Sequence, residues 1–241
     1  MMQLSFADAD FHPHQPRVRI SSRARRLSLR VHRDASVEVV VPPRISPRRV
    51  QHFLASHAGW IATQVAAARS ALPAPQPFPP TEILLPALAE RWQLQFEPSA
   101  KRFSLTAQGG GHLLVKGHCD TAQFAQHLRR WLLQHATSQI GQQLQALAGA
   151  TGWHYRQLTV RRQRRRWGSC SPRRTISLNI CLVFQSPDIA RYLMIHELAH
   201  LAHMNHSSQF WQAVALHCPN WRQLDRELLT GWRQVPQWIF L

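Results

Sequence analysis

The run His196-Glu197-Leu198-Ala199-His200 constrains this chain more than any other stretch of its sequence. On an α-helix, residues four positions apart lie one turn above each other, about 6 Å apart along the axis, so both imidazoles can bind one ion. Glu197 is rotated off that face but stays beside the ion, where its carboxylate can accept a proton from a water whose pKa the metal has lowered. The run therefore predicts a catalytic zinc site with Glu197 as the general base.

A catalytic zinc site normally has three protein ligands and one open position, so a third ligand is required. His203 lies about 10 Å further along a continuing helix than His196, too far for bonds of about 2 Å to the same ion. His206 can reach the ion if the helix ends first and the chain folds back at Met204-Asn205, because asparagine tolerates the left-handed conformation that ends helices. The predicted zinc ligands are His196, His200 and His206.

Composition restricts the class of protein. The formal net charge is +17, carried almost wholly by arginine, and such a field attracts polyanions, including nucleic acid and nucleotides. Arginine-rich surfaces also keep proteins soluble, so charge alone does not specify a partner. No stretch has the roughly 20 apolar residues that cross a bilayer, and residues 1–20 lack the apolar segment of a signal peptide. We expect a cytoplasmic protein with reduced cysteines, because the four cysteines form no C-x-x-C pair.

The first half of the chain reads as strands around one helix. Alternation of basic and apolar residues over 17–41 predicts a β-hairpin with its turn near Arg33-Asp34-Ala35. A helix capped by Ser46 is predicted over residues 46–68, followed by a proline-rich connector over 71–80. Four short strands are predicted after it, at 83–85, 92–96, 103–106 and 112–115, with a glycine turn at 109–111 before the last.

The second half is richer in helix. Apolar spacing predicts a long amphipathic helix over 122–148. Strands are predicted at 157–162 and 175–184, flanking a loop around Trp167. A helix capped by Ser186 should run from 188 to about 204, followed by helices over 208–217 and 220–229. The fold class is therefore α+β, with an N-terminal β-rich α/β region over 1–118 and a second domain over 119–241.

Two segments of the sequence resemble a known family. HELAHLAHMNHSSQFW (196–211) and RRQRRRWGSCSPRRTISLNICLVF (161–184) resemble the YgjP-like metallopeptidases, a zincin-like family related to SprT-like proteins. The resemblance extends to SSRARRLSLRV (21–31) and to the helix with Phe53 and Trp60, so it covers most of the chain. It implies zinc at the three predicted histidines, a catalytic Glu197, and a zincin-like catalytic domain over 119–241. The spacing also fits metzincins, but these carry glycine where His203 stands and a downstream methionine turn that this chain lacks.

The segment Trp167-Gly168-Ser169-Cys170 is a second mark of the family, and it suggests substrate contacts. A zincin usually binds its substrate along an exposed strand edge above the metal helix. Trp167 could wall that cleft, and Arg166 or Ser169 could contact an oxyanion or a phosphate. In the alternative interpretation, Trp167 is a core residue and Gly168 serves the turn.

Three functions stay open at this stage. The leading hypothesis is hydrolysis of a peptide or protein by zinc-activated water, with Glu197 moving the proton. The second is metal-dependent hydrolysis of nucleoside triphosphates, with the arginines of 161–166 binding phosphates. Against it, enzymes of that kind commonly use Mg²⁺ with oxygen ligands, and the sequence has no G-x-x-x-x-G-K-[ST] loop. The third is a nucleic-acid-binding module with structural zinc, although structural sites normally have four ligands.

Overall fold

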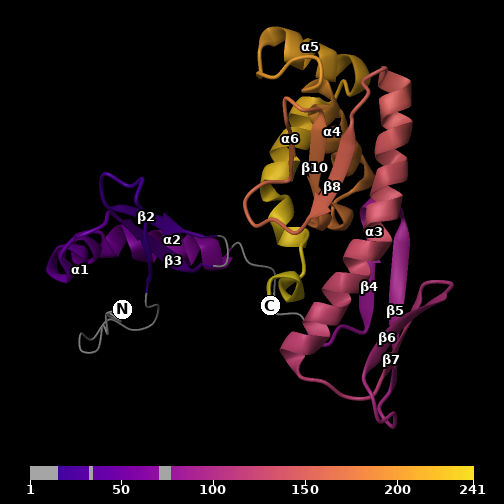
Figure 1. Cartoon of the computed structure of the whole chain (residues 1–241), viewed down its shortest axis with the longest axis horizontal. Helices are drawn as coiled ribbons and strands as arrows, with labels where there is room; N and C mark the ends of the chain where they lie inside the picture. Colours follow the sequence, from indigo (N-terminus) through magenta and orange to yellow (C-terminus); the bar gives the residue numbers. More distant parts are fainter. Residues whose placement is uncertain (1–15, 33–34, 71–76) are drawn as a thin grey trace. The chain divides into compact units, whose positions relative to one another are not determined.

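The structure is a computed structural model that describes residues 16–32, 35–70 and 77–241. It divides into two compact units, Met1–Ala74 and Pro75–Leu241 (Figure 1). The boundary predicted from the sequence, after residue 118, differs from this division. The boundary in the structure is earlier because the strands between 82 and 116 share one apolar core with the helices that follow them, as the contacts of Leu85 and Leu113 illustrate. The α+β class is confirmed.

The N-terminal unit contains a three-stranded sheet. Its strands are β1 (Arg17–Ile20), β2 (Ser28–Val31) and β3 (Val37–Val41), in the order β1-β3-β2. β2 and β3 pair antiparallel, which confirms the predicted hairpin, whereas β1 pairs parallel with β3. Two residues of the predicted turn, 33 and 34, lie outside the described residues.

The helix predicted over 46–68 is two helices, α1 (Pro47–Ser56) and α2 (Ala58–Ser70), separated at His57. Ser46 precedes the proline at the first helical position, but its hydroxyl makes no capping hydrogen bond. Each helix buries one valine against a different part of β3: Val50 packs with Val39 and Val41, and Val65 packs with Val37. The break at His57 separates these two small clusters.

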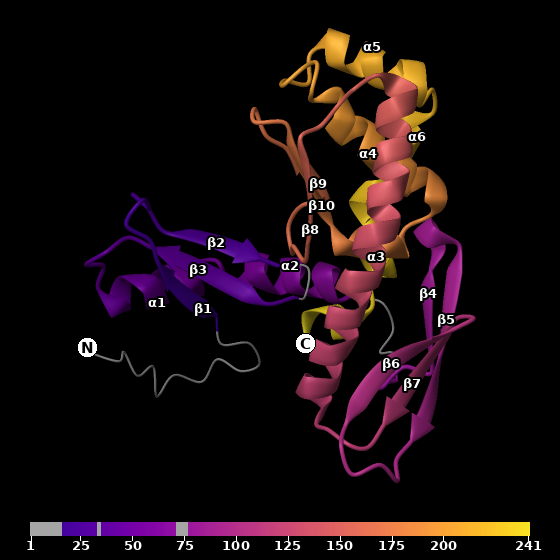
Figure 2. The same ribbon diagram turned by 45° about the vertical axis from the view of Figure 1, so that its right-hand side comes forward.

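A four-stranded sheet begins the C-terminal unit. Its strands are β4 (Glu82–Leu85), β5 (Glu90–Glu97), β6 (Ser104–Gly109) and β7 (His112–Lys116), in the order β4-β5-β7-β6. All four predicted strands are confirmed, and Gly109, Gly110 and Gly111 form the predicted turn with positive φ angles. The long helix is also confirmed as α3 (Thr121–Thr151), which runs from β6 to the second sheet and α4 (Figure 2).

The second sheet contains β8 (Gln157–Arg161), β9 (Gly168–Cys170) and β10 (Thr175–Asn179), in the order β8-β10-β9. The prediction that a strand extends to residue 184 is wrong, because Ile180–Phe184 forms a 3₁₀ turn with all five residues buried. Asn179 ends the strand: its side-chain oxygen accepts a hydrogen bond from the Cys181 N–H (3.1 Å), which turns the backbone away from the sheet.

Three helices complete the unit: α4 (Pro187–Ala199), α5 (Ser208–His217) and α6 (Trp221–Thr230). Ser186 caps α4 as predicted, since its hydroxyl accepts from the Ile189 N–H (3.3 Å). The predicted end near 204 is wrong, because α4 stops at Ala199 with His200 as its C-cap. Short 3₁₀ turns at Gly231–Gln234 and Gln237–Phe240 follow α6. Among the described residues, no helix has both the length and the apolar character needed to cross a membrane.

Adjacent leucines on α6 test its packing, because Leu228 is 7% exposed and Leu229 is 67% exposed. Leu228→Ala should lower the free energy of unfolding by about 2–5 kcal/mol, the usual loss for a buried leucine. Leu229→Ala, the matched control, should change it by no more than about 0.5 kcal/mol. Urea denaturation followed by circular dichroism measures both values. Equal losses in the two variants would contradict the described orientation of α6.

Candidate metal centre

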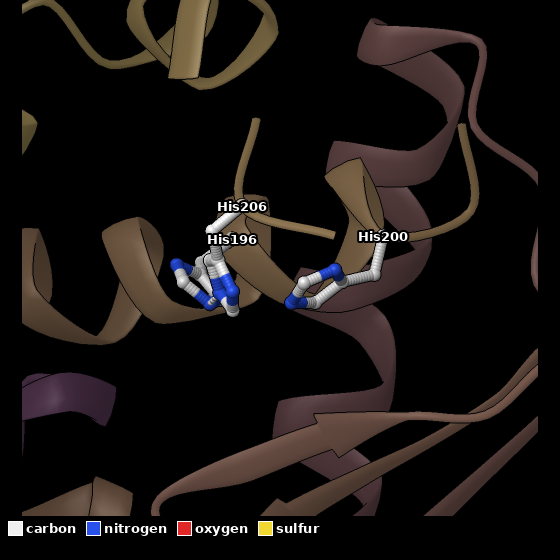
Figure 3. Close-up of side chains that lie close together, drawn as sticks. All are labelled: His196, His200 and His206. Atoms are coloured by element: carbon white, nitrogen blue, oxygen red, sulfur yellow. Dashed lines mark hydrogen bonds between the residues drawn. The ribbon is translucent and has the colours of Figure 1, made fainter. Parts of the chain in front are cut away.

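Three histidines from α4 and the loop after it converge on one point. His196 lies in the last turn of α4, His200 is its C-cap, and His206 lies in the loop before α5. One ring nitrogen from each lies within 4.8 Å of the others, and His196 Nε2 is 3.1 Å from His206 Nε2. Figure 3 shows the imidazole of His200 directed toward the other two. The structure thus brings together the three histidines that sequence spacing selected, and this group could hold a metal ion.

The early end of α4 makes this convergence possible. The N–H groups of Leu201 and Ala202 donate to the carbonyls of Leu198 and Ala199, three residues back, so the helix tightens and stops. The chain therefore begins to reverse at His200, before the predicted bend at Met204-Asn205. After the reversal, Ser207 caps α5 by accepting from the Phe210 N–H (3.4 Å). His206 immediately precedes this cap, which fixes where its side chain starts.

His203 lies outside the group but contributes its backbone. The carbonyl of His203 is 3.1 Å from His200 Nδ1, so Nδ1–H donates to it and the lone pair of Nε2 faces away from the bond. Burial, followed by the proximity of His200 and His206, lowers the pKa of His196 to about 3. Burial also lowers the pKa of His200. Both imidazoles are therefore neutral at pH 7, the form in which histidine binds metals.

Two aromatic side chains of α5, Phe210 and Trp211, pack against the histidines. The ring of Phe210 is fully buried, and its centroid lies 5.0 Å from that of His196, 4.6 Å from that of His200 and 4.7 Å from that of His206. Trp211 lies beside His196 and His206 and stacks on Trp221 of α6 at 4.0 Å. These aromatic rings limit how far the imidazoles can turn.

Glu197 is 4% exposed and lies against β9. Burial raises the pKa of its carboxyl to about 8, and the positive charge of Arg166 opposes part of that rise. Its Oε2 is buried and has no hydrogen-bond partner among the described residues. A buried polar atom without a partner is costly, so its retention points to a group that binds there or to a role in chemistry.

Gly168 makes room for this carboxylate. A Cβ built on Gly168 would lie 2.5 Å from Glu197 Oε1 and 2.8 Å from its Cδ, closer than non-bonded atoms approach. In the alternative interpretation of the sequence Gly168 served a turn, whereas it is the first residue of β9. A glycine inside a strand often marks a close approach of another group, and that signal could have identified it.

The other residues of the segment have different surroundings. Trp167 is 9% exposed, and its ring packs on Trp232 at 4.2 Å, so it is a core residue, as the alternative interpretation held. Arg166 is exposed, and Ser169 is half-buried on β9 opposite Ser177. A substrate contact from Arg166, Trp167 or Ser169 stays a prediction. Burial and the nearby Glu197 raise the pKa of Cys170 to about 11, so its thiol is protonated.

Sequence reasoning missed Asn179, which holds the arginine-rich loop beside the site. Its side chain is fully buried, and its Nδ2 donates to the carbonyls of Gln163 and Arg166 at 2.8 Å each. Its backbone N–H donates to the Trp167 carbonyl (2.7 Å). The loop before β9 is thus attached to the end of β10. The signal in the sequence is an asparagine that follows the alternating strand residues and precedes an apolar run.

Comparisons with known proteins agree with the resemblance noted from the sequence. The chain matches the family model of the YgjP-like metallopeptidase domain over residues 25–230. Among solved structures, it is similar to the metallopeptidase zymogen of Pyrococcus abyssi abylysin, with 24% identity over 38% of this chain and 92% of that chain, and a TM-score of 0.35. A likeness of this extent does not define the fold or the chemistry of the present chain. No curated protein matches it.

Replacing Gly168 tests the contact with Glu197. Gly168→Ala should lower the free energy of unfolding by about 1–3 kcal/mol, because the new methyl group overpacks the carboxylate. The matched control is Gly149→Ala in α3, where an added Cβ meets nothing within 4 Å. The control should stabilise the protein by about 0.4–1 kcal/mol, since alanine restricts the unfolded chain. If both variants were stabilised, the close approach of Gly168 and Glu197 would be wrong.

Proposed function

The chain belongs to the YgjP-like metallopeptidase family, and from this premise we propose that it is a zinc-dependent peptidase. In this proposal His196, His200 and His206 hold the zinc ion, and Glu197 is the general base. One observation carries the proposal: three imidazoles have ring nitrogens within 4.8 Å of one another, and the residue next to His196 is a buried carboxylate.

The donor set fits zinc. All three donors are imidazole nitrogens, which suit zinc, whereas Mg²⁺ and Ca²⁺ prefer oxygen ligands. Three protein ligands leave one coordination position for water or substrate, the arrangement typical of catalytic rather than structural zinc. When bound, zinc lowers the pKa of a coordinated water and polarises the carbonyl of the bond to be cleaved.

Glu197 would perform the proton transfers. The ionised form of this carboxyl, which a nearby cation would favour despite the burial, can accept a proton from the attacking water and later donate it to the leaving amine. Two features of the chain support this role. The Oε2 atom has no hydrogen-bond partner among the described residues, so it is available to a water. Gly168 also keeps the neighbouring strand close, which restricts the positions that the carboxylate can take.

β9 is the strand that a peptide substrate would pair with. It lies at an edge of its sheet, with β10 as its neighbour, and it contacts α4. An extended peptide can add to such an edge through backbone hydrogen bonds, which recognise peptides of many sequences. Because Gly168 of β9 lies against Glu197, a peptide on this edge would lie near the general base. A peptide or protein is therefore the proposed substrate.

Two of the arginines that suggested a nucleotide bind backbone carbonyls of the chain itself. Arg162 Nη1 donates to the Ile239 carbonyl (2.7 Å), and Arg164 Nη2 donates to the Phe240 carbonyl (3.2 Å). These contacts hold the C-terminal turn against the loop, and they account for part of the arginine run without a phosphate ligand. Within residues 16–32, 35–70 and 77–241, no contact favours nucleotide hydrolysis or a nucleic-acid-binding role over peptide cleavage. The cytoplasm remains the compartment that we propose.

Zinc retention tests the ligand assignment. His206→Ala should reduce the zinc that copurifies from about one ion per chain to a small fraction, because it removes one of three ligands. His203→Ala is the matched control, and it should keep its zinc because the contact with His200 uses the backbone carbonyl of His203. Metal content is measured by mass spectrometry after dialysis. Loss of zinc from the control but not from His206→Ala would refute the assignment.

Glu197→Gln tests the general base. The glutamine has the same size but cannot accept a proton, so the variant should fold, bind zinc and lose turnover by about 10²- to 10⁴-fold. The assay follows cleavage of an unstructured protein, with nucleoside triphosphates assayed in parallel. Turnover near the wild-type rate in the fully metallated variant would rule out the proposed role of Glu197. Turnover of nucleotides alone would support the second hypothesis from the sequence.

A further inference from the structure

A tyrosine and an aspartate stand behind His196 on the side away from the other histidines. Tyr192 precedes His196 by one turn of α4 and is 1% exposed. Its hydroxyl lies 2.7 Å from Asp225 Oδ1 on α6 and 3.5 Å from His196 Nδ1. The Nε2 atom of the same imidazole is 3.1 Å from His206 Nε2. One ring nitrogen of His196 therefore faces the hydroxyl, and the other faces the candidate ligand group.

The chemistry of the three side chains fixes the direction of the hydrogen bonds. An ionised carboxylate can only accept, so the Tyr192 hydroxyl donates its proton to Asp225. The hydroxyl oxygen can then only accept from its second partner, so the proton must lie on Nδ1 of His196. Nε2 consequently carries the lone pair, directed toward His206.

We propose, on the premise of the zinc site above, that Tyr192 and Asp225 are positioning residues that hold His196 as the Nδ1–H tautomer with Nε2 toward the ion. A partner of this kind orients a ligating histidine and raises its basicity. The contact spans two helices, because α4 carries the histidine and α6 carries the aspartate. α6 therefore has a role at the site although it supplies no ligand.

The other two histidines lack this arrangement. His200 is oriented by the carbonyl of His203, a backbone group that substitution does not remove. His206 is exposed, and its Nε2 lies 3.1 Å from His196 Nε2. His196 is thus the one ligand candidate whose orientation depends on side chains from a second element, at least within the described part of the chain. Changes at Tyr192 or Asp225 can therefore weaken the site without touching a ligand.

The first measurement is the zinc affinity of the full chain, which is determined by competition with a chromophoric chelator. Tyr192→Phe removes only the hydroxyl and should weaken zinc binding about 10- to 100-fold, the usual effect of losing such a partner. Asp225→Asn keeps an acceptor for the hydroxyl, so its loss should be smaller than that of Tyr192→Phe. Glu227→Gln is the matched control on the exposed side of α6 and should bind zinc like the wild type. Circular dichroism verifies that each variant folds.

The tautomer of His196 is the second measurement, and a role limited to packing would not change it. Nitrogen-15 NMR of zinc-free protein should find Nδ1 of His196 protonated in the wild type and a mixture of tautomers in Tyr192→Phe. If Tyr192→Phe does not fold, Asp225→Ala, which removes the acceptor of the hydroxyl proton, is examined in the same way, and a mixture of tautomers is again expected. An Nε2–H tautomer in the wild type would overturn the proposal.

His196→Ala separates the failure of this proposal from the failure of the proposed zinc site. If His196→Ala abolishes zinc binding while the folded Tyr192→Phe binds zinc like the wild type, the positioning role is wrong and the zinc site stands. If His196→Ala also keeps its zinc, the ion is not bound at these histidines, and both proposals fail.

Discussion

The end of α4 at His200 is the constraint on which the rest of the site depends. If the helix continued, His206 would be carried away from His196 along the axis, and the three imidazoles could not meet. The chain instead tightens over Leu198 to Ala202, and the His200 side chain donates to the carbonyl of His203 within the turn. One histidine thus contributes a ring nitrogen to the group and also closes the turn that brings in the third. The residue at which α4 ends therefore determines which histidines can come together in the candidate ligand group.

The remaining elements hold this turn and its carboxylate in place. Phe210 and Trp211 of α5 contact the imidazoles, and Trp221 of α6 stacks on Trp211. β9 approaches Glu197 so closely that a Cβ at residue 168 would lie 2.5 Å from Glu197 Oε1. Asn179 then attaches the preceding loop to the end of β10. A catalytic group works best when packing and hydrogen bonds determine its position, and these contacts meet that requirement.

Charge is distributed unevenly between the surface and the site. The chain has 29 lysines and arginines against 12 acidic residues. Two of the acidic residues nevertheless lie in the region of the histidines: Glu197 follows His196 in the sequence, and Asp225 contacts Tyr192, which lies beside His196. Glu197 is buried, and its Oε2 has no hydrogen-bond partner in the part of the chain that the structure describes. Asp225 accepts from the tyrosine behind His196. Several arginines, by contrast, hold backbone carbonyls of the C-terminal turn, including Arg129 on Trp238 and Arg162 on Ile239. Part of the net charge therefore has a structural role.

The sequence by itself was enough to select His196, His200 and His206 and most of the helices and strands. These features depend on short-range spacing: two histidines one helical turn apart, alternation in strands, and a serine cap before α4. It could not determine contacts between residues distant in the chain. Gly168 meets Glu197, Asp225 meets Tyr192, and the strands of 82–116 join the C-terminal core only after the chain has folded. For the same reason the end of β10 at Asn179 differs from the prediction, and the burial of Trp167 favours one of two interpretations that the sequence left open. Each depends on partners that sequence spacing does not reveal, so the tertiary structure alone decided them.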